Sequence, residues 1–269
     1  MTSATLDNPT PDASSVAEAD AGMPVAQDRK GFLWFGTQNG LNHYDGYRFT
    51  VYRNEPGVAN SLPGNIITAI AETTGASGTR LWVATTQGLA AFDAALQQFT
   101  RHYADPANPS TLSSNELQAL HVDEAGMLWV GTRNGLDRLD PATGVVTRFE
   151  HRATDSRTLT AGMVTAIAGA SGGNIWAGTE GGLSLLDVAS GRVTRFTHDR
   201  LDPTSLADNR VRALLVDKRG RLWVGTDTRG LDRYDARTGQ FTHFPPGSGI
   251  SNASVTALLE DADGRIWAG

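Results

Sequence analysis

The sequence predicts an all-β protein built from a repeated four-stranded unit, and three observations lead to this expectation. Glycine is frequent, with 30 residues, and it recurs at turn positions. A Gly-Leu pair and then an Asp follow five of the tryptophans in constant phase. All six tryptophans share one local context, at intervals of 48, 47, 47, 47 and 44 residues: Trp34, Trp82, Trp129, Trp176, Trp223 and Trp267.

One unit, Asn115 to Glu150, illustrates the elements in order. Asn134-Gly135 and the Asp140 to Gly144 segment are turn signals, because their glycines adopt a positive φ without strain. Between the turns lie short, β-rich runs: ELQALHV, MLWVGT, LDRLD and VVTRFE. A four-stranded antiparallel unit repeated every 40–50 residues or so is typical of a β-propeller blade.

The packing of a propeller explains the recurrent residues. Each blade lies between two neighbours, so its inner strands should be apolar on both faces. The tryptophan of each unit is expected to fill the gap between adjacent blades, since large aromatic side chains dominate core packing. A small residue recurs in the strand expected nearest the axis: Ala69, Ala119, Ala166, Ala213 and Ala257.

The repeats define the expected domains. Residues 1–23 are rich in small, polar and acidic residues without periodicity, which predicts disorder. Residues 24–269 are expected to form a partial β-propeller of five full repeats and a partial sixth, with Val25–Gln27 as a degenerate first inner strand. An open ring leaves unpaired strand edges, so we expect the chain to be a fragment of a larger protein with more blades.

Composition excludes several classes of protein. Cysteine is absent, which excludes disulfide scaffolds, zinc-thiolate sites and thiol catalysis. A net charge of -6 argues against nucleic acid as a partner. The chain has no apolar run long enough to span a membrane and begins without the features of a signal peptide.

The repeat motif resembles the two-component regulator propeller repeat. The resemblance rests on GRLWVGT at Gly220–Thr226, GLDRYD at Gly230–Asp235 and the linker at Asp105–Asn115. It implies the N-terminal sensor region of a bacterial hybrid histidine kinase or diguanylate cyclase, located in the periplasm. It also implies downstream signalling domains as partners, and a glycan-derived or other small molecule as the ligand.

The titratable residues offer little chemistry. One acid per repeat precedes a turn and is interpreted as a turn cap: Asp45, Asp93, Asp140, Asp187 and Asp235. A second set lies six residues before a tryptophan, at Asp28, Asp123, Asp217 and Asp261, where Ala76 and Ala170 stand in the other two repeats. Four histidines, His102, His151, His198 and His243, are expected at solvated positions of outer strands. We therefore expect no catalytic residue, no metal site and no cofactor.

Candidate ligand-binding residues lie in the turn between the second and third strands of each repeat. These turns vary in sequence while their flanks repeat, and variable polar groups on a rigid scaffold commonly determine ligand specificity. The candidates are Gln38, Gln87, Arg133, Glu180 and Arg229. These turns and the segments before the first strands, which contain Asn65, Asn115 and Asn209, are expected to open on one face.

Three functional hypotheses remain. The first is a non-catalytic ligand-sensing module of a two-component or cyclic-di-GMP receptor. The second is a protein-interaction scaffold, which the fold alone does not distinguish from a sensor. The third is a propeller enzyme resembling streptogramin lyases, which would require a histidine and a metal-binding acid to meet at the mouth of the channel.

Overall fold

The computed structural model describes residues 23–75 and 78–269 of the chain. Within these ranges the chain forms 22 β-strands and one short 3-10 helix, η2 (Ser171–Gly173). The described ranges contain no helix with the length and apolar character needed to cross a membrane. The expected disorder concerns residues 1–23, of which residues 1–22 lie outside the described residues.

The strands form five four-stranded sheets and one two-stranded sheet, and each strand pairs antiparallel with the next in the sequence. The first sheet contains β1 (Val25–Gln27), β2 (Leu33–Thr37), β3 (Gly40–Tyr44) and β4 (Phe49–Tyr52). The second contains β5 (Ile67–Gly75), β6 (Gly78–Thr85), β7 (Gly88–Asp93) and β8 (Gln98–His102). The third contains β9 (Leu117–Val122), β10 (Leu128–Thr132), β11 (Gly135–Leu139) and β12 (Val146–Glu150).

The remaining strands repeat this order. The fourth sheet contains β13 (Val164–Gly169), β14 (Ile175–Thr179), β15 (Gly182–Asp187) and β16 (Arg192–Phe196). The fifth contains β17 (Val211–Val216), β18 (Leu222–Thr226), β19 (Leu231–Asp235) and β20 (Gln240–Phe244). The sixth contains only β21 (Leu258–Glu260) and β22 (Ile266–Ala268).

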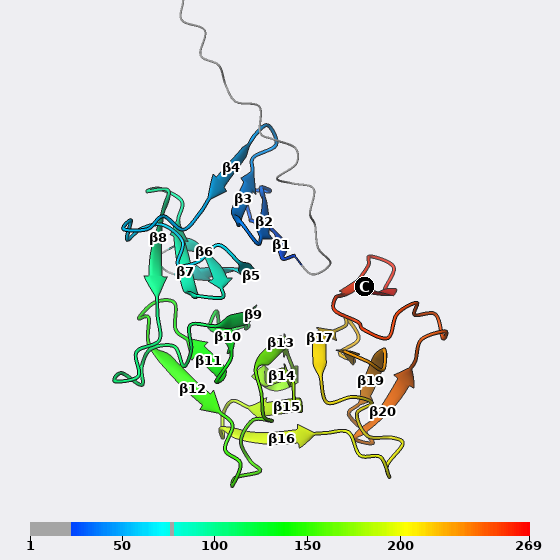
Figure 1. Ribbon diagram of the computed structural model, residues 1–269. Coiled ribbons are helices and arrows are strands. Elements are labelled where there is room, and N and C mark those ends of the chain that lie inside the picture. The colour runs from blue at the N-terminus through cyan, green and yellow to red at the C-terminus, as the bar shows by residue number, and fades with distance from the viewer. Residues whose placement is uncertain (1–22, 76–77) are drawn as a thin grey trace, which may run out of the picture.

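The sheets are arranged radially, as blades of a propeller (Figure 1). The first strand of each blade lies near the common centre and the fourth strand lies on the periphery. The ring is open between the first blade and the two-stranded sheet. The all-β propeller with five full repeats and a partial sixth is therefore confirmed, and Val25–Gln27 is the inner strand of the first blade.

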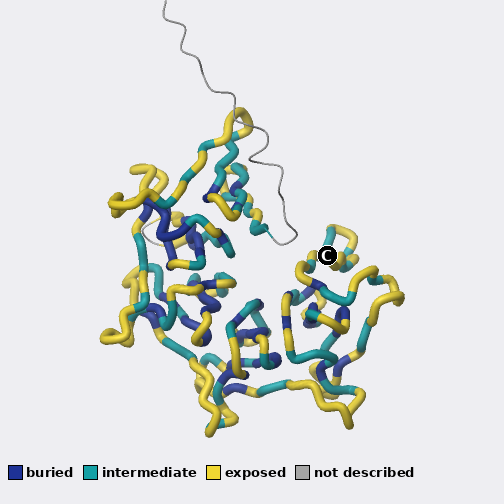
Figure 2. Tube along the Cα trace, viewed as in Figure 1, coloured by how far each residue is buried: buried dark blue, intermediate teal, exposed yellow. Residues whose placement is uncertain are grey.

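Four of the six tryptophans pack against the following blade, as the sequence predicts: Trp34, Trp82, Trp129 and Trp176. The four hydrophobic clusters of the described residues each join one indole to the second and third strands of the next blade. Trp129, for example, packs with Ile175, Ala177 and Leu186 of the fourth blade. Buried residues accordingly concentrate along the blades, and the turns are exposed (Figure 2). Trp267 is 59% exposed, because it lies in the terminal sheet.

Small residues allow the inner strands to approach one another. Gly131 on β10 pairs with Ala119 on β9. A Cβ added at Gly131 would lie 2.7 Å from the carbonyl oxygen of Val164, on the inner strand of the next blade. The glycine two residues after the tryptophan is therefore required by the close approach of neighbouring blades.

A hydrogen bond that the sequence analysis missed fixes most of the indoles. The acid six residues before the tryptophan accepts a hydrogen bond from the indole Nε1, in addition to capping its own turn. These pairs are Trp34–Asp28 at 3.0 Å, Trp129–Asp123 at 2.8 Å, Trp223–Asp217 at 2.9 Å and Trp267–Asp261 at 2.9 Å. In the second blade, Trp82 donates instead to Thr73 Oγ1 at 2.8 Å; Ala76 lies outside the described residues.

A second missed contact connects successive blades. The linker that precedes the third blade contains Thr111 and Leu112. Arg148 on β12 donates hydrogen bonds to the carbonyl oxygens of both residues, each at 2.8 Å. Arg101 and Arg195 bind their own linkers in the same way. These clamps hold each linker against the outer strand of the blade that follows it.

Candidate functional site

The turns between second and third strands lie beside the segments that precede the inner strands. Backbone hydrogen bonds connect the two: Arg133 N donates to Glu116 O at 3.0 Å, and Asp227 N to Arg210 O at 2.9 Å. Both loop sets therefore share one end of the propeller, as expected. We call this end the hairpin face and define it by residues 38–39, 86–87, 133–134, 180–181 and 227–229.

A threonine hydroxyl group bonds to the backbone of each of these turns, and the threonine is buried in every blade except the first. Thr132 Oγ1 donates to the carbonyl oxygen of Gly135 at 3.1 Å and accepts from Asn134 N at 3.1 Å. The hydroxyl group of the equivalent threonine also bonds to the turn glycine in the other four blades: Thr37, Thr85, Thr179 and Thr226. The same hydroxyl contact therefore recurs in all five turns, and the turn of the fifth blade is one residue longer than the other four.

All five candidate ligand-binding residues lie on the hairpin face and are exposed: Gln38, Gln87, Arg133, Glu180 and Arg229. Arg133 pairs with Glu116 at 2.9 Å, and Glu180 Oε2 accepts a weak hydrogen bond from Met163 N at 3.4 Å. Within the described ranges, no hydrogen bond or ion pair joins any two of the five candidates. The structure places one candidate on each blade and leaves all of them accessible.

The hairpin face also holds a charged cluster that the sequence analysis did not identify. Asp227 lies between Arg210 and Arg212, with ion pairs of 2.8 and 3.0 Å. Thr228 donates to Asp208 beside it. The sequence feature that could have indicated this cluster is the pair Arg210 and Arg212 at the start of an inner strand. Residues two apart in a strand lie on the same side of it.

Buried acids lie directly beneath this face. Asp137 on β11 is fully buried, and its Oδ2 accepts hydrogen bonds from Ser113 N at 2.7 Å and Ser113 Oγ at 3.0 Å. Its Oδ1 has no partner within the described ranges. Burial raises the pKa of Asp137 from 3.8 to about 6. Asp232 occupies the equivalent position of the fifth blade, and burial also raises its pKa.

The expectation of solvated outer-strand histidines holds for His151 and His198, which are exposed, whereas His102 and His243 are partly buried. His151 and His198 use Nδ1 to bind the carbonyl oxygens of Leu159 and Leu206, at 2.7 and 2.9 Å. His243 lies between the Asp232 carboxylate, at 2.7 Å, and the Pro203 carbonyl oxygen, at 2.9 Å. Burial lowers the pKa of His102. These rings hold linkers and blades in place, because the linker folds back over the end of the outer strand.

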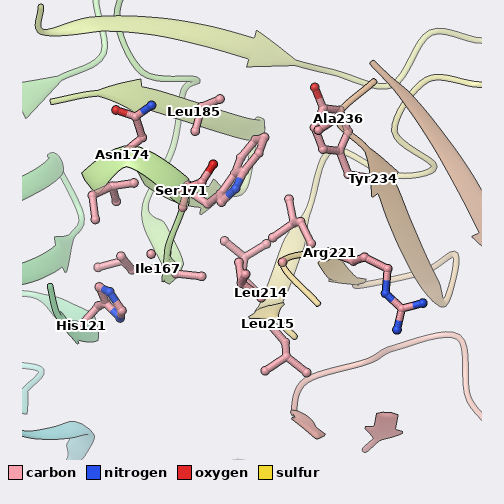
Figure 3. Close-up of a pocket in the computed structure, with 18 of the residues that line it drawn as sticks. His121, Ile167, Ser171, Asn174, Leu185, Leu214, Leu215, Arg221, Tyr234 and Ala236 are labelled. Carbon is pink, nitrogen blue, oxygen red and sulfur yellow. The ribbon is translucent and has the colours of Figure 1, made fainter. Parts of the chain in front are cut away.

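A cavity of about 1220 Å³ opens at the end opposite the hairpin face. It is bounded by the first turns of the third, fourth and fifth blades and by the end of β19. His121, Ser171, Asn174, Leu214 and Tyr234 surround this space (Figure 3). The sequence analysis did not predict this cavity. Small residues of the lining, such as Ala168, Gly169 and Ala170, have no side-chain groups that would indicate a binding site in the sequence.

Across the described parts of the chain, no three His, Asp or Glu side chains come close enough together to hold a metal ion.

Comparisons with protein families agree with the repeat analysis. The model described as "two component regulator propeller" matches residues 249–269, and the model described as "SMP-30/gluconolactonase/LRE-like region" matches residues 135–255. A segment of 40 residues is 45% identical to histidine kinase P4 of Formosa agariphila. That segment represents 15% of this chain and 3% of the kinase.

Solved structures share the fold over most of the chain. The extracellular domain of BT3049, a hybrid two-component system of B. thetaiotaomicron, is 26% identical over 92% of this chain, with a TM-score of 0.65. This chain spans 38% of the length of that domain. Virginiamycin B lyase of Staphylococcus aureus is 16% identical over 93% of this chain and 78% of the lyase, with a TM-score of 0.65. At this level of identity the likeness to the lyase concerns the fold alone.

The radial four-stranded sheets and their repeated motif define the class of the protein, a β-propeller. Its residues 249–269 match the model of the two-component regulator propeller repeat, and its fold is similar to that of the BT3049 extracellular domain.

Proposed function

We propose that this chain is a non-catalytic, ligand-engaging propeller of a bacterial receptor that signals through a two-component phosphorelay or cyclic di-GMP. The observation that carries the proposal is the likeness to the BT3049 extracellular domain over 92% of the chain. By analogy with that domain, the propeller would lie outside the cytoplasm, in the periplasm or at the cell surface. Downstream signalling domains would be its partners in the full-length receptor.

The hairpin face supports the assignment of ligand contacts to this end. Five exposed side chains, two Gln, two Arg and one Glu, stand on turns in which a threonine hydroxyl group bonds to the turn glycine. For ligand binding to produce a signal, the receptor must have two conformations, and the ligand must change their relative populations. A small polar or glycan-derived ligand would bind to these turns through Arg133 and Arg229. Its binding would change the conformation of the propeller and so affect the neighbouring domains.

The experiment is a ligand-observed NMR screen of oligosaccharides and other polar small molecules against the whole chain. Affinity for the compound selected is then measured with the Arg133→Ala/Arg229→Ala variant. We expect binding to weaken by about tenfold, or 1.4 kcal/mol. A matched variant, Arg192→Ala/Arg200→Ala, removes the same charge away from the hairpin face and should bind as the wild type does. Equal affinities of all three proteins would contradict the proposed contacts.

The alternatives give different outcomes in the same experiment. A non-catalytic receptor returns the compound unchanged after long incubation, whereas a lyase converts it. A protein-interaction scaffold leaves the small-molecule screen without hits and instead captures a protein through the same face.

A further inference from the structure

The fourth blade differs from the others at its tryptophan. In the five other repeats a side-chain oxygen accepts the indole N–H, from an Asp six residues before the tryptophan or from Thr73. In the fourth blade this position is Ala170, and Trp176 Nε1 has no hydrogen-bond partner within the described ranges. The turn itself keeps its length, because Ala170 N still donates to Asn174 O at 2.8 Å.

Trp176, whose indole N–H has no acceptor within the described ranges, borders the cavity opposite the hairpin face. Trp176 is 6% exposed, so nine-tenths of the residue is buried, and it lines this cavity. Among the described residues, five have a solvent-inaccessible side-chain N or O atom without a hydrogen-bond partner: His43, Thr68, His102, Asp137 and Arg138. Trp176 Nε1 is not among them, which means that a molecule in the cavity can reach it.

The walls around this donor suit a molecule with an apolar face. Tyr234 lies edge-on to Trp176, with ring centroids 5.3 Å apart. Leu214 and Leu215 from β17 form the adjacent wall, and Ser171 borders it (Figure 3).

The charges at the rim favour an anion. Arg219 and Arg237 are exposed, and within the described ranges neither side chain has an acidic partner within 4.0 Å. The Asp123 carboxylate is already occupied by Trp129 Nε1 and two backbone N–H groups. Asp235 accepts a hydrogen bond from Arg237 N, and Glu124 is the one acid of the lining with no contact. Donors therefore outnumber free acceptors around the cavity.

We propose that this cavity binds a small organic anion, whose carboxylate or phosphate group accepts from Trp176 Nε1 and an arginine of the rim. Its apolar ring or chain packs against Leu214, Leu215 and Tyr234. Ala170 creates the site, because an acid at this position would take the indole N–H and place a negative charge in the cavity. The inference is independent of the receptor assignment, since it concerns the other face and requires no downstream domain.

The experiment is ¹⁹F NMR of the whole chain labelled with 5-fluorotryptophan, with the Trp176 resonance assigned from Trp176→Phe. The probes are two matched pairs: benzoate with benzyl alcohol, and glucuronate with glucose. We expect at least one acid to shift the Trp176 resonance in a saturable manner, with its neutral partner binding about tenfold more weakly. Failure of both acids to shift this resonance, or equal binding of the neutral partners, would overturn the proposal.

The Ala170→Asp variant supplies the second test. It should move the Trp176 resonance without ligand and weaken binding of the acid by about tenfold or more. Ala170→Ser is the matched control of similar size and should retain more of the affinity. The five other tryptophan resonances report whether each variant is folded, and Arg219→Gln replaces Ala170→Asp if that variant does not fold. Undiminished binding by the folded Ala170→Asp variant, or by Arg219→Gln in its place, would contradict the proposed site.

Discussion

Asp123 Oδ2 accepts a hydrogen bond from Trp129 Nε1 over 2.8 Å. The other oxygen of the same carboxylate accepts from Ala125 N and Met127 N, at 3.0 and 2.9 Å. One side chain therefore closes the first turn of the blade and orients the indole that packs against the next blade. Local turn chemistry and the packing between blades are coupled through this residue.

Asp123→Ala should lower the free energy of unfolding by about 2–3 kcal/mol, because the variant leaves the Trp129 N–H and two backbone N–H groups without their acceptor. Urea denaturation followed by tryptophan fluorescence measures the change. Glu124→Ala is the control, since the adjacent acid is exposed and should change stability by less than about 0.5 kcal/mol. Similar effects of the two substitutions would contradict the coupling.

Asp137 should make stability depend on pH. Burial raises its pKa in the folded chain from 3.8 to about 6, so folding favours the protonated form. Its contribution to stability is present below pH 4 or so and is lost as the pH rises through about 6, a difference of about 3 kcal/mol. Asp137→Asn removes this titration, so its stability relative to the wild type should increase between about pH 4 and pH 7. Urea midpoints over this range provide the measurement.

Asp140→Asn is the control for that experiment. The Ala142 backbone N–H lowers the pKa of Asp140, which is exposed, so its contribution is lost as the pH falls. Because this change occurs below about pH 4, the stability of Asp140→Asn relative to the wild type should stay nearly constant between pH 4 and pH 7. A parallel pH profile for Asp137→Asn and the wild type would refute the assigned role of Asp137.

Arg148→Lys should loosen one linker between blades. The guanidinium group donates to Thr111, Leu112 and Asn108 at 2.8, 2.8 and 3.0 Å, and an ammonium group cannot reproduce this geometry. Hydrogen exchange should become faster in residues 105–112. Residues 152–159 provide an internal control, because Arg195 holds them. Exchange that is equally fast in both linkers would indicate general destabilisation and count against a local clamp.

Gly131→Ala should destabilise the interface between the third and fourth blades. The added Cβ would lie 2.7 Å from Val164 O and 3.0 Å from Val164 Cγ1. Overpacking of this kind costs about 1–3 kcal/mol. Gly75→Ala is the comparison, since no atom lies within 4 Å of an added Cβ there. Thermal denaturation of both variants tests the expectation, and an unchanged Gly131→Ala midpoint would contradict it.

The repeat made the fold predictable from the sequence. The spacing of the tryptophans gave the blades, and Asn134-Gly135 with its equivalents gave the hairpins. The aspartates before the outer strands were identified as turn caps, and Asp140 accepts from Ala142 N as expected. These features follow from local chemistry, and they recur often enough to be read without a structure.

The missed features depend on distance in space or on a single repeat. Arg148 contacts a linker 36 to 43 residues earlier in the chain, and no local pattern indicates that pairing. The interval of six residues between Asp123 and Trp129, which recurs in three other repeats, was visible in the sequence. The acid was interpreted only as a cap of its turn. Ala170 was noticed as an exception to this pattern, but its consequence for Trp176 requires knowledge of the space beside the indole.

The most direct test of the central claim, ligand engagement by the hairpin face, is hydrogen exchange of the whole chain with and without the compound selected by screening. We expect protection in peptides that contain residues 38–39, 86–87, 133–134, 180–181 or 227–229, with the outer strands unchanged. Protection confined to the outer strands, or absent from all of these turns at saturating compound, would contradict the claim.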